Sequence, residues 1–169
     1  PIGDLIIYFL ALDAEISLKN ERDRRIIKLR DFYIDYKVMD IEEGEIVEWL
    51  RINNKEKLFN FEKVARRKYM DIASVNSAIS FDLNNDKIQN AHLSAGGVAP
   101  VPKYLEKTSN YLENKKISED IIKEAVKIAD SEISPIDDVR GSARYKRLLL
   151  RQLIYAHFLT LLPELEVLL

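Results

Sequence analysis

The hydrophobic residues of this chain change their spacing part of the way along it, and this change limits the possible folds. Over residues 14–95 several segments alternate apolar with polar residues, a spacing typical of half-buried strands. Beyond residue 103 the apolar residues recur every three to four positions, which is typical of amphipathic helices. A set of strands followed by a set of helices predicts an α+β fold.

One helix is predicted ahead of the strands. Residues 2–12 are strongly apolar, but they number about half of the ~20 residues that a bilayer-spanning helix needs. We therefore expect a short buried helix, with Asp4 as its N-cap.

Three strands are expected next. Residues 14–19 and 25–34 alternate on either side of a polar turn and predict a hairpin. Residues 45–52 alternate again around Trp49 and predict a third strand. The polar stretch 52–60 indicates a linker.

A domain boundary is therefore placed near residue 57, which divides the chain into residues 1–57 and 58–169. In the second part, Ile79 and Phe81 share one face of a strand that turns at residues 84–86. The returning strand, 87–95, changes its inward phase between Ile88 and Ala91. We expect a β-bulge there.

Three helices complete the chain. They are predicted over 103–115, from Ser118 to about residue 133, and from Ser142 to about residue 162, before Pro163. Both serines are expected N-caps, and a proline cannot continue a helix.

Composition excludes several kinds of site. The chain has no cysteine, so disulfides, thiolate metal sites and cysteine-ligated iron–sulfur clusters are excluded from this polypeptide. Its histidines, His92 and His157, lie far apart in sequence, and we predict no metal site. A net charge of −2 argues against nucleic acid and anionic membranes as partners. No nucleophile motif or phosphate-binding loop is present, so no catalytic residue is predicted.

Targeting is the last property that the sequence bears on. The chain begins at Pro1 without a basic segment ahead of an apolar run, so we expect no secretory signal. We expect a cytoplasmic protein and a chain that starts inside a longer one.

Two charged segments have alternative interpretations. Segment 62–71 gathers four cations around Tyr69, and is either a solvated face or a contact for an anion or an aromatic cofactor, with Lys63 as donor. Segment 137–147 is either a turn that opens the last helix or a surface on which Arg140 and Tyr145 dock a partner.

Two further segments are less charged. Residues 95–100, Ala-Gly-Gly-Val-Ala-Pro, indicate a turn that needs a positive φ. Residues 32–37 are either core aromatics or a place where Tyr36 and Lys37 meet a flat ring.

Several segments, in this order, resemble one family. PIGDLIIYFLALDAEI, RDFYIDYK, EGEIVEWLRI, FEKVARRKYMDIA, AGGVAP and ISPIDDVRGSARYKRLLL are similar to the flavoprotein subunit of the molybdenum hydroxylases. That group includes the xanthine dehydrogenase, carbon monoxide dehydrogenase and aldehyde oxidoreductase flavoproteins. The resemblance implies the second lobe of a PCMH-type FAD-binding domain at 1–57, and a small antiparallel sheet with C-terminal helices at 58–169. The N-terminal lobe, which holds the FAD diphosphate, is not in this sequence.

The resemblance also implies FAD contacts for three residues. Asp4 matches an acidic residue on the nucleotide side of FAD, Val47 an apolar residue near the flavin, and Lys63 a lysine at the edge of the isoalloxazine ring. Residues 66–71 match the loop beside the flavin that helps to govern access of the electron acceptor.

The function that follows is that of an FAD-dependent oxidoreductase subunit. In this family, electrons pass from a molybdopterin subunit through [2Fe–2S] clusters to FAD, and then to NAD or another acceptor. The molybdopterin and iron–sulfur subunits are therefore the expected partners. The alternative is a cofactor-free scaffold or interaction module that keeps the fold, and a further possibility is that a separate chain supplies the missing lobe.

Overall fold

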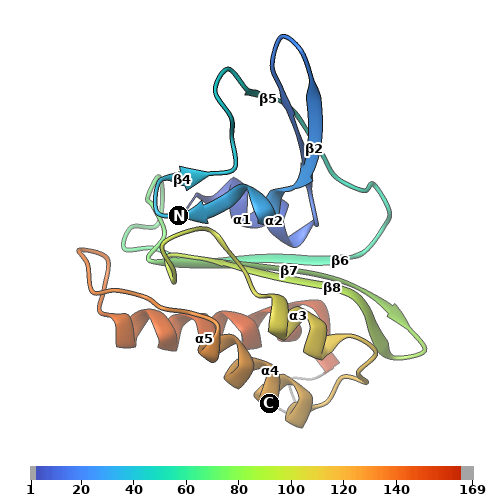
Figure 1. Cartoon of the computed structure of the whole chain (residues 1–169). Coiled ribbons are helices and arrows are strands. Elements are labelled where there is room, and N and C mark those ends of the chain that lie inside the picture. The colour runs from blue at the N-terminus through green and yellow to red at the C-terminus, as the bar shows by residue number, and fades with distance from the viewer. Residues whose placement is uncertain (1–2, 165–169) are drawn as a thin grey trace.

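The computed structural model describes residues 3–164, which form layers of sheets and helices (Figure 1). A three-stranded sheet lies above α1 and α2, a four-stranded sheet crosses the middle, and three helices cover its lower face. This arrangement confirms the predicted α+β class. The elements are α1 (Asp4–Ala11), β1 (Glu15–Lys19), β2 (Arg24–Lys28), α2 (Leu29–Phe32), β3 (Tyr33–Asp35), β4 (Val38–Met39), β5 (Ile46–Arg51), β6 (Leu58–Val64), β7 (Val75–Asn84), β8 (Lys87–Gly96), β9 (Lys103–Tyr104), α3 (Glu106–Leu112), α4 (Glu119–Ser131) and α5 (Ala143–Leu161).

The four-stranded sheet is antiparallel, in the order β6-β7-β8-β9. Ser80 lies opposite His92, but Asp82 lies opposite Gln89, so β8 holds one residue more than β7 in this interval. Asn90 lies in that interval and has a φ of 51°, in the left-handed region that asparagine tolerates better than most residues. The β-bulge predicted between Ile88 and Ala91 is confirmed.

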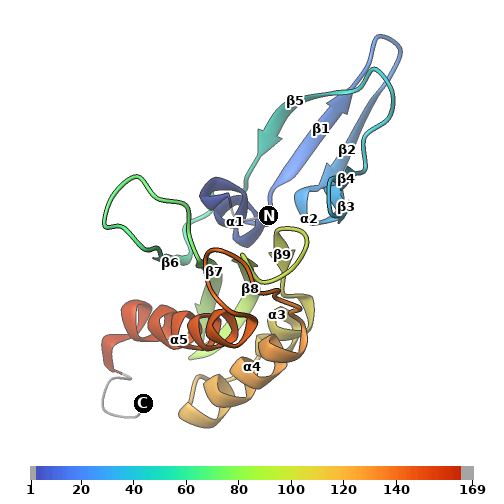
Figure 2. The same ribbon diagram turned by 90° about the vertical axis from the view of Figure 1, so that its left-hand side faces the viewer.

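The lower face of this sheet carries the larger hydrophobic core. Ile79 and Phe81 of β7 are fully buried there and belong to one cluster with apolar residues of α3, α4 and α5. Figure 2 shows these three helices and the sheet from the side. The rings of Phe81 and Phe158 stack with their centroids 6.1 Å apart. The periodic apolar residues of the helices therefore face the sheet, as amphipathic helices do.

The upper face of the sheet is lined by small residues, which allow α1 to approach closely. Ser80 Oγ donates a 2.6 Å hydrogen bond to the carbonyl of Ala11, and Ser94 Oγ donates one of 2.7 Å to that of Ile7. Both serines are fully buried, so these bonds satisfy hydroxyls that would otherwise be costly. They fix α1, and with it Asp4, relative to β7 and β8.

The helix caps are partly as predicted. The side chain of Ser118 accepts a hydrogen bond from the N–H of Ile121, and that of Ser142 accepts one from the N–H of Tyr145. Asp4, in contrast, is not the N-cap of α1, because Gly3 holds that position and Asp4 is the first helical residue.

Other predicted boundaries were also wrong. The helix expected from residue 103 begins at Glu106, because Lys103 pairs with Ala95 and Tyr104 with Ser94 as the edge strand β9. The strand expected over 25–34 ends at Lys28, and Leu29–Phe32 form the short helix α2.

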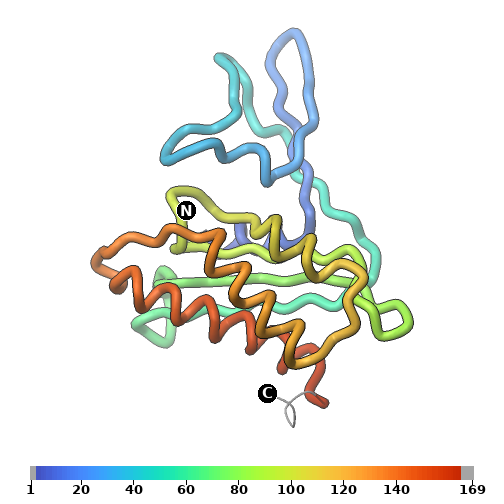
Figure 3. The backbone as a smooth tube through the Cα atoms, turned by 60° about the horizontal axis from the view of Figure 1, so that its bottom comes forward, coloured from blue at the N-terminus to red at the C-terminus, as the bar shows by residue number. Residues whose placement is uncertain are grey.

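The upper sheet has the order β2-β1-β5, which confirms the predicted hairpin and third strand. After β5, residues 52–57 form neither helix nor strand and lead down into β6, a path that Figure 3 follows. The linker expected over 52–60 is therefore shorter than predicted, because Leu58–Asn60 already pair with β7 as the start of β6. The boundary near residue 57 stays a prediction. None of the helices within residues 3–164 combines the length and the apolar character of a membrane span.

Candidate cofactor site

Lys63 and Asp4, two of the three predicted cofactor contacts, meet at one end of the four-stranded sheet. Lys63 lies near the end of β6, opposite Asn76 of β7. Its Nζ lies 2.7 Å from Asp4 Oδ2 at the start of α1, and Asn76 Nδ2 donates a 2.7 Å hydrogen bond to Asp4 Oδ1. One carboxylate therefore holds both an ammonium and an amide in place.

Asn76 is a residue of this site that the sequence did not reveal. It is fully buried, and its Oδ1 is the one buried side-chain polar atom of residues 3–164 without a hydrogen-bond partner. A buried acceptor left unsatisfied costs about 1–3 kcal/mol. The polar groups at this end of the sheet are thus not fully satisfied by the described residues.

A hollow of about 340 Å³ opens beside Lys63. It is formed by the segment 65–73, here called the cationic loop, which connects β6 to β7. The residues that line it, three cations and one carboxylate among them, are Lys63, Ala65, Arg67, Lys68, Met70 and Asp71.

The cationic loop is held together by Asp71. The Asp71 carboxylate accepts hydrogen bonds of 2.9 Å from the N–H groups of Arg67 and Ile72, and Arg67 Nη2 lies 3.5 Å from it. The hydrogen bond from the Arg67 N–H is the largest of the influences that hold the pKa of Asp71 below its ordinary value. Tyr69 and Met70, at 73% and 97% exposure, lie at the exposed tip of the loop.

Val47, the third predicted contact, lies elsewhere. It belongs to β5 of the upper sheet, where it pairs with Leu18 and is half exposed. No hydrogen bond or ion pair described for residues 3–164 connects β5 to Asp4 or Lys63. The structure thus brings two of the three residues together, and the FAD contacts of all three stay predictions.

The other segments singled out in the sequence contain turns, and residues 32–37 also include the end of α2, where Phe32 is buried in the core, and the strand β3. Gly97 has a φ of 79°, in agreement with the turn expected after β8. Tyr36 is 60% exposed and Lys37 has a φ of 58°, so Tyr36 lies outside the hydrophobic core. Arg140, considered as a partner contact, donates from Nη1 to the carbonyl of Ile72 in its own chain at 3.0 Å.

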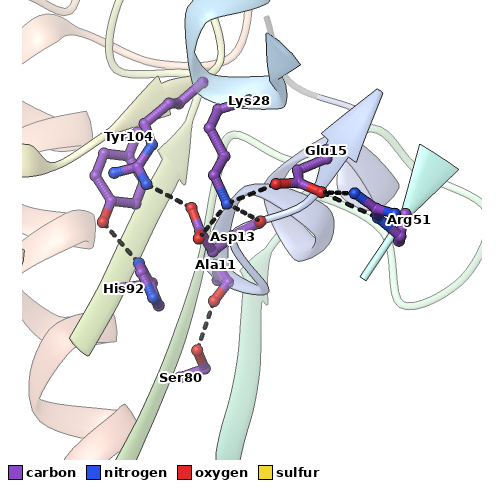
Figure 4. Close-up of polar contacts among 9 residues, drawn as sticks. Ala11, Asp13, Glu15, Lys28, Arg51, Ser80, His92 and Tyr104 are labelled. Carbon is purple, nitrogen blue, oxygen red and sulfur yellow. Dashed lines mark hydrogen bonds and ion pairs between the residues drawn. The ribbon is translucent and has the colours of Figure 1, made fainter. Parts of the chain in front are cut away.

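A second hollow, of about 570 Å³, lies between the upper sheet and the first half of β8, and no pattern in the sequence predicted it. Asp13 has a φ of 52°. Its carboxylate forms ion pairs with Lys28 Nζ at 2.8 Å and with Arg30 Nη2 at 2.5 Å. Glu15 lies 3.3 Å from Lys28 and 2.7 Å from Arg51 (Figure 4). These charges pair with one another along β1, β2 and β5, so the row stabilises the upper sheet and the segment that leads into it.

His92 lines the same hollow. Its Nδ1 lies 2.8 Å from Tyr104 Oη (Figure 4), and the Arg30 guanidinium lies 4.4 Å above the centre of the Tyr104 ring. Burial lowers the pKa of His92, which favours a neutral imidazole. Among residues 3–164, no three His, Cys, Asp or Glu side chains are grouped so that they could hold a metal ion.

Comparison with protein families gives two matches that together cover most of the chain. A model described as the FAD binding domain in molybdopterin dehydrogenase matches residues 1–53. A second model, the CO dehydrogenase flavoprotein C-terminal domain, matches residues 60–161.

Two curated relatives illustrate the similarity. The chain is 27% identical over 147 residues to the glyceraldehyde dehydrogenase medium chain of Sulfolobus acidocaldarius, with 87% of this chain and 52% of that protein covered. It is 30% identical over 151 residues to xanthine dehydrogenase 1 of Arabidopsis thaliana, with 83% and 11% covered. The chain thus spans about half the length of the medium chain.

Solved structures have the same fold. A chain of the carbon monoxide dehydrogenase from Hydrogenophaga pseudoflava matches with a TM-score of 0.85 at 21% identity, over 91% of this chain and 54% of that one. A chain of the CO dehydrogenase from Oligotropha carboxidovorans matches with a TM-score of 0.84 at 24% identity, over 90% and 54%. With both family models matched in order along the sequence, this chain belongs to the FAD-binding flavoprotein family of the molybdenum hydroxylases.

Proposed function

We propose that this chain forms the second lobe and the C-terminal domain of a flavoprotein that transfers electrons in a molybdenum hydroxylase. Electrons would arrive from iron–sulfur clusters on a partner subunit that serves a molybdopterin subunit, and would leave through FAD to NAD or another acceptor. Residues 1–57 and 58–169 would be its two domains. The observation that carries the proposal is the match of two flavoprotein family models in order along the chain, and Lys63, which lines the hollow and pairs with Asp4, is the residue that tests it.

The residues at this site fit the ring side of a flavin. The side chain of Lys63 is 28% exposed. Its ammonium is held in place by the carboxylate of Asp4. Asn76 adds a buried acceptor whose hydrogen bonding is incomplete. A cation and unsatisfied polar groups together suit the oxygen- and nitrogen-rich edge of an isoalloxazine ring.

The same residues do not fit the phosphates of FAD. No glycine lines the hollow, and glycine-rich turns at helix N-termini are the usual phosphate-binding device. We therefore assign the diphosphate to a lobe outside this sequence. When bound, FAD supplies the redox chemistry itself, and the role of this chain is to hold and tune it.

The charge of the cationic loop supports an anionic electron acceptor. Of the charged residues that line the hollow, Lys63 and Arg67 are paired with Asp4 and Asp71, whereas no ion pair is described for Lys68. The lining therefore has a positive excess, which raises the local concentration of anions such as NAD.

Lys63 provides the sharpest test. A cation beside the pyrimidine edge of the ring favours negative charge there and so raises the reduction potential of the flavin. In the intact flavoprotein, Lys63→Ala should lower the FAD midpoint potential, as measured by spectroelectrochemical titration. The midpoint potential of Lys63→Arg should stay close to that of the parent protein, because the cation is retained.

Lys57→Ala is the matched control, because Lys57 precedes β6 and lines the other hollow. Its potential should equal that of the parent protein. An unchanged potential in Lys63→Ala would contradict the assignment of Lys63.

A cofactor-free scaffold is the second candidate function, and one observation favours it. Asp4 already neutralises Lys63 within the chain, so the pair is stable without a ligand. Reconstitution with the preceding lobe separates the two candidates: a bound oxidised flavin gives absorbance at about 450 nm. A colourless assembly would leave only the scaffold.

A further inference from the structure

The cationic loop is anchored to the rest of the molecule by a turn that lies far from it in sequence. Arg140 Nη1 donates a 3.0 Å hydrogen bond to the carbonyl of Ile72, and Ser74 Oγ donates one of 3.0 Å to the carbonyl of Arg140. Of the side chains in residues 3–164, Arg140 is the one outside the loop that donates a hydrogen bond to it. Figures 1 and 3 show the two segments at the same end of the molecule.

The turn that carries Arg140 is rigid. Asp138 and Gly141 exchange backbone hydrogen bonds of 3.1 Å, and the N–H of Arg140 donates to Asp138 Oδ1 at 2.8 Å. The ammonium of Lys146, on a side chain only 3% exposed, reaches Asp138 Oδ2 at 2.7 Å and the carbonyl of Ile136 at 2.9 Å. A buried ammonium with two good acceptors fixes the turn onto α5, because leaving either partner unpaired is costly.

The position of Gly141 adds to this rigidity. Its φ is 151°, and a Cβ there would lie 2.6 Å from Cδ1 of Tyr145. The backbone can therefore pass directly over the Tyr145 ring only because residue 141 has no side chain. This close approach holds the backbone next to Arg140 against α5.

The loop by itself has weaker constraints. Its internal bonds join Arg67 with Met70 and Asp71, and its base closes where the N–H of Ser74 meets the carbonyl of Val64 at 2.7 Å. Residues 66–70 are all exposed. Exposed segments with few buried contacts open at low free energy, so a single outside anchor has a large influence on where the loop lies.

We propose that Arg140 is a positioning residue: it fixes the cationic loop and thereby the shape of the hollow beside Lys63 through which the electron acceptor approaches. The first part of this inference, that Arg140 fixes the loop, stands alone. The second part, that it shapes the approach of the electron acceptor, rests on the proposed function. Arg140 makes this contact within its own chain, and the interpretation in which it docks a partner subunit stays a prediction.

Tryptic cleavage of the full chain tests the anchor without any cofactor. The loop holds three adjacent trypsin sites, after Arg66, Arg67 and Lys68. Proteolysis in the native state follows the population of the open form, and losing a hydrogen bond from a charged donor changes such a population on the order of tenfold. Arg140→Gln should therefore speed cleavage at these sites by about tenfold, as followed by mass spectrometry.

Three comparisons keep this result interpretable. Arg144→Gln, at an exposed arginine with no hydrogen bond or ion pair among the described residues, should leave cleavage unchanged. Arg140→Lys, which retains one donor, should restore part of the protection. Cleavage after Lys127 inside α4 reports global unfolding, so the ratio of loop to helix cleavage remains informative even in a destabilised variant. An equal ratio in Arg140→Gln and the parent protein would overturn the proposal.

The intact flavoprotein tests the functional half. Arg140→Gln should change the rate constant for reoxidation of the reduced protein by NAD or a dye acceptor, and Arg140→Lys should partly rescue it. Faster loop cleavage with an unchanged reoxidation rate would overturn the functional half. A protein that binds no FAD would refute the proposed function, and the cleavage ratio would still decide whether Arg140 anchors the loop.

Discussion

His157 provides a stability test that depends only on burial. It lies on α5 with no exposed surface, between Asn60 Nδ2 and Ser77 Oγ, each 3.0 Å from one ring nitrogen. Because Asn60 can only donate from Nδ2, the facing Nδ1 accepts, and Nε2 carries the proton toward Ser77. Both nitrogens of a neutral ring are thus satisfied, and burial lowers the pKa of His157 to about 3.

The size of the effect follows from linkage. The unfolded chain has an ordinary histidine pKa of about 6.5, so below that pH it binds a proton that the folded protein does not. The stability contributed by the neutral ring is complete above pH 6.5 and is lost as the pH falls toward 3. The slope is about 1.4 kcal/mol per pH unit, which amounts to about 2 kcal/mol by pH 5.

Urea denaturation at pH 7, 6 and 5 measures this loss. His157→Gln removes the titrating group, and its free energy of unfolding should fall by about 2 kcal/mol less between pH 7 and pH 5 than that of the parent protein. His92→Gln, at the partly exposed histidine, is the control and should keep most of the acid-dependent loss. Parallel pH profiles for His157→Gln and the parent protein would show that the reasoning is wrong.

Two further substitutions test the core and the turn. Phe158→Ala removes a fully buried ring that stacks on Phe81, and should lower the free energy of unfolding by about 3–5 kcal/mol in urea titration; a loss below 1 kcal/mol would mean that the helices do not pack on the sheet as described. Gly141→Ala places a methyl group 2.6 Å from the Tyr145 ring at a φ of 151°, and the backbone strain alone should cost about 1–3 kcal/mol. An equally stable alanine variant would contradict the close approach at Gly141.

Features that depend on neighbours in sequence were predicted well. The bulge at Asn90 followed from a change of phase within one strand, and the caps at Ser118 and Ser142 from residue type next to an amphipathic segment. Asp4 was misplaced as a cap because an aspartate at N1 resembles one at the N-cap when only the sequence is read. Tyr104 was taken as helical because the edge pairing of β9 is invisible to periodicity.

The candidate site was only partly predictable. Lys63 and Asp4 were named through resemblance to a family, and the structure adds that they are partners. Neither the burial of Asn76 nor the contact of Arg140 with the loop could be predicted from the sequence. Residue type and spacing do not distinguish a buried asparagine from an exposed one, or an arginine that contacts a distant loop from one that does not.

The sequence by itself determined the α+β class, the order of most strands and helices, and that no cysteine chemistry is available. Those properties follow from local backbone preferences and from the periodicity of apolar residues. Only the tertiary structure decided that Lys63 meets Asp4 across 59 residues, that Asn76 meets Asp4 across 72, and that Arg140 meets Ile72 across 68. Such contacts exist because the sheet, α1 and α5 pack their apolar faces together, and which polar side chains then come within hydrogen-bonding distance is a property of that packed arrangement.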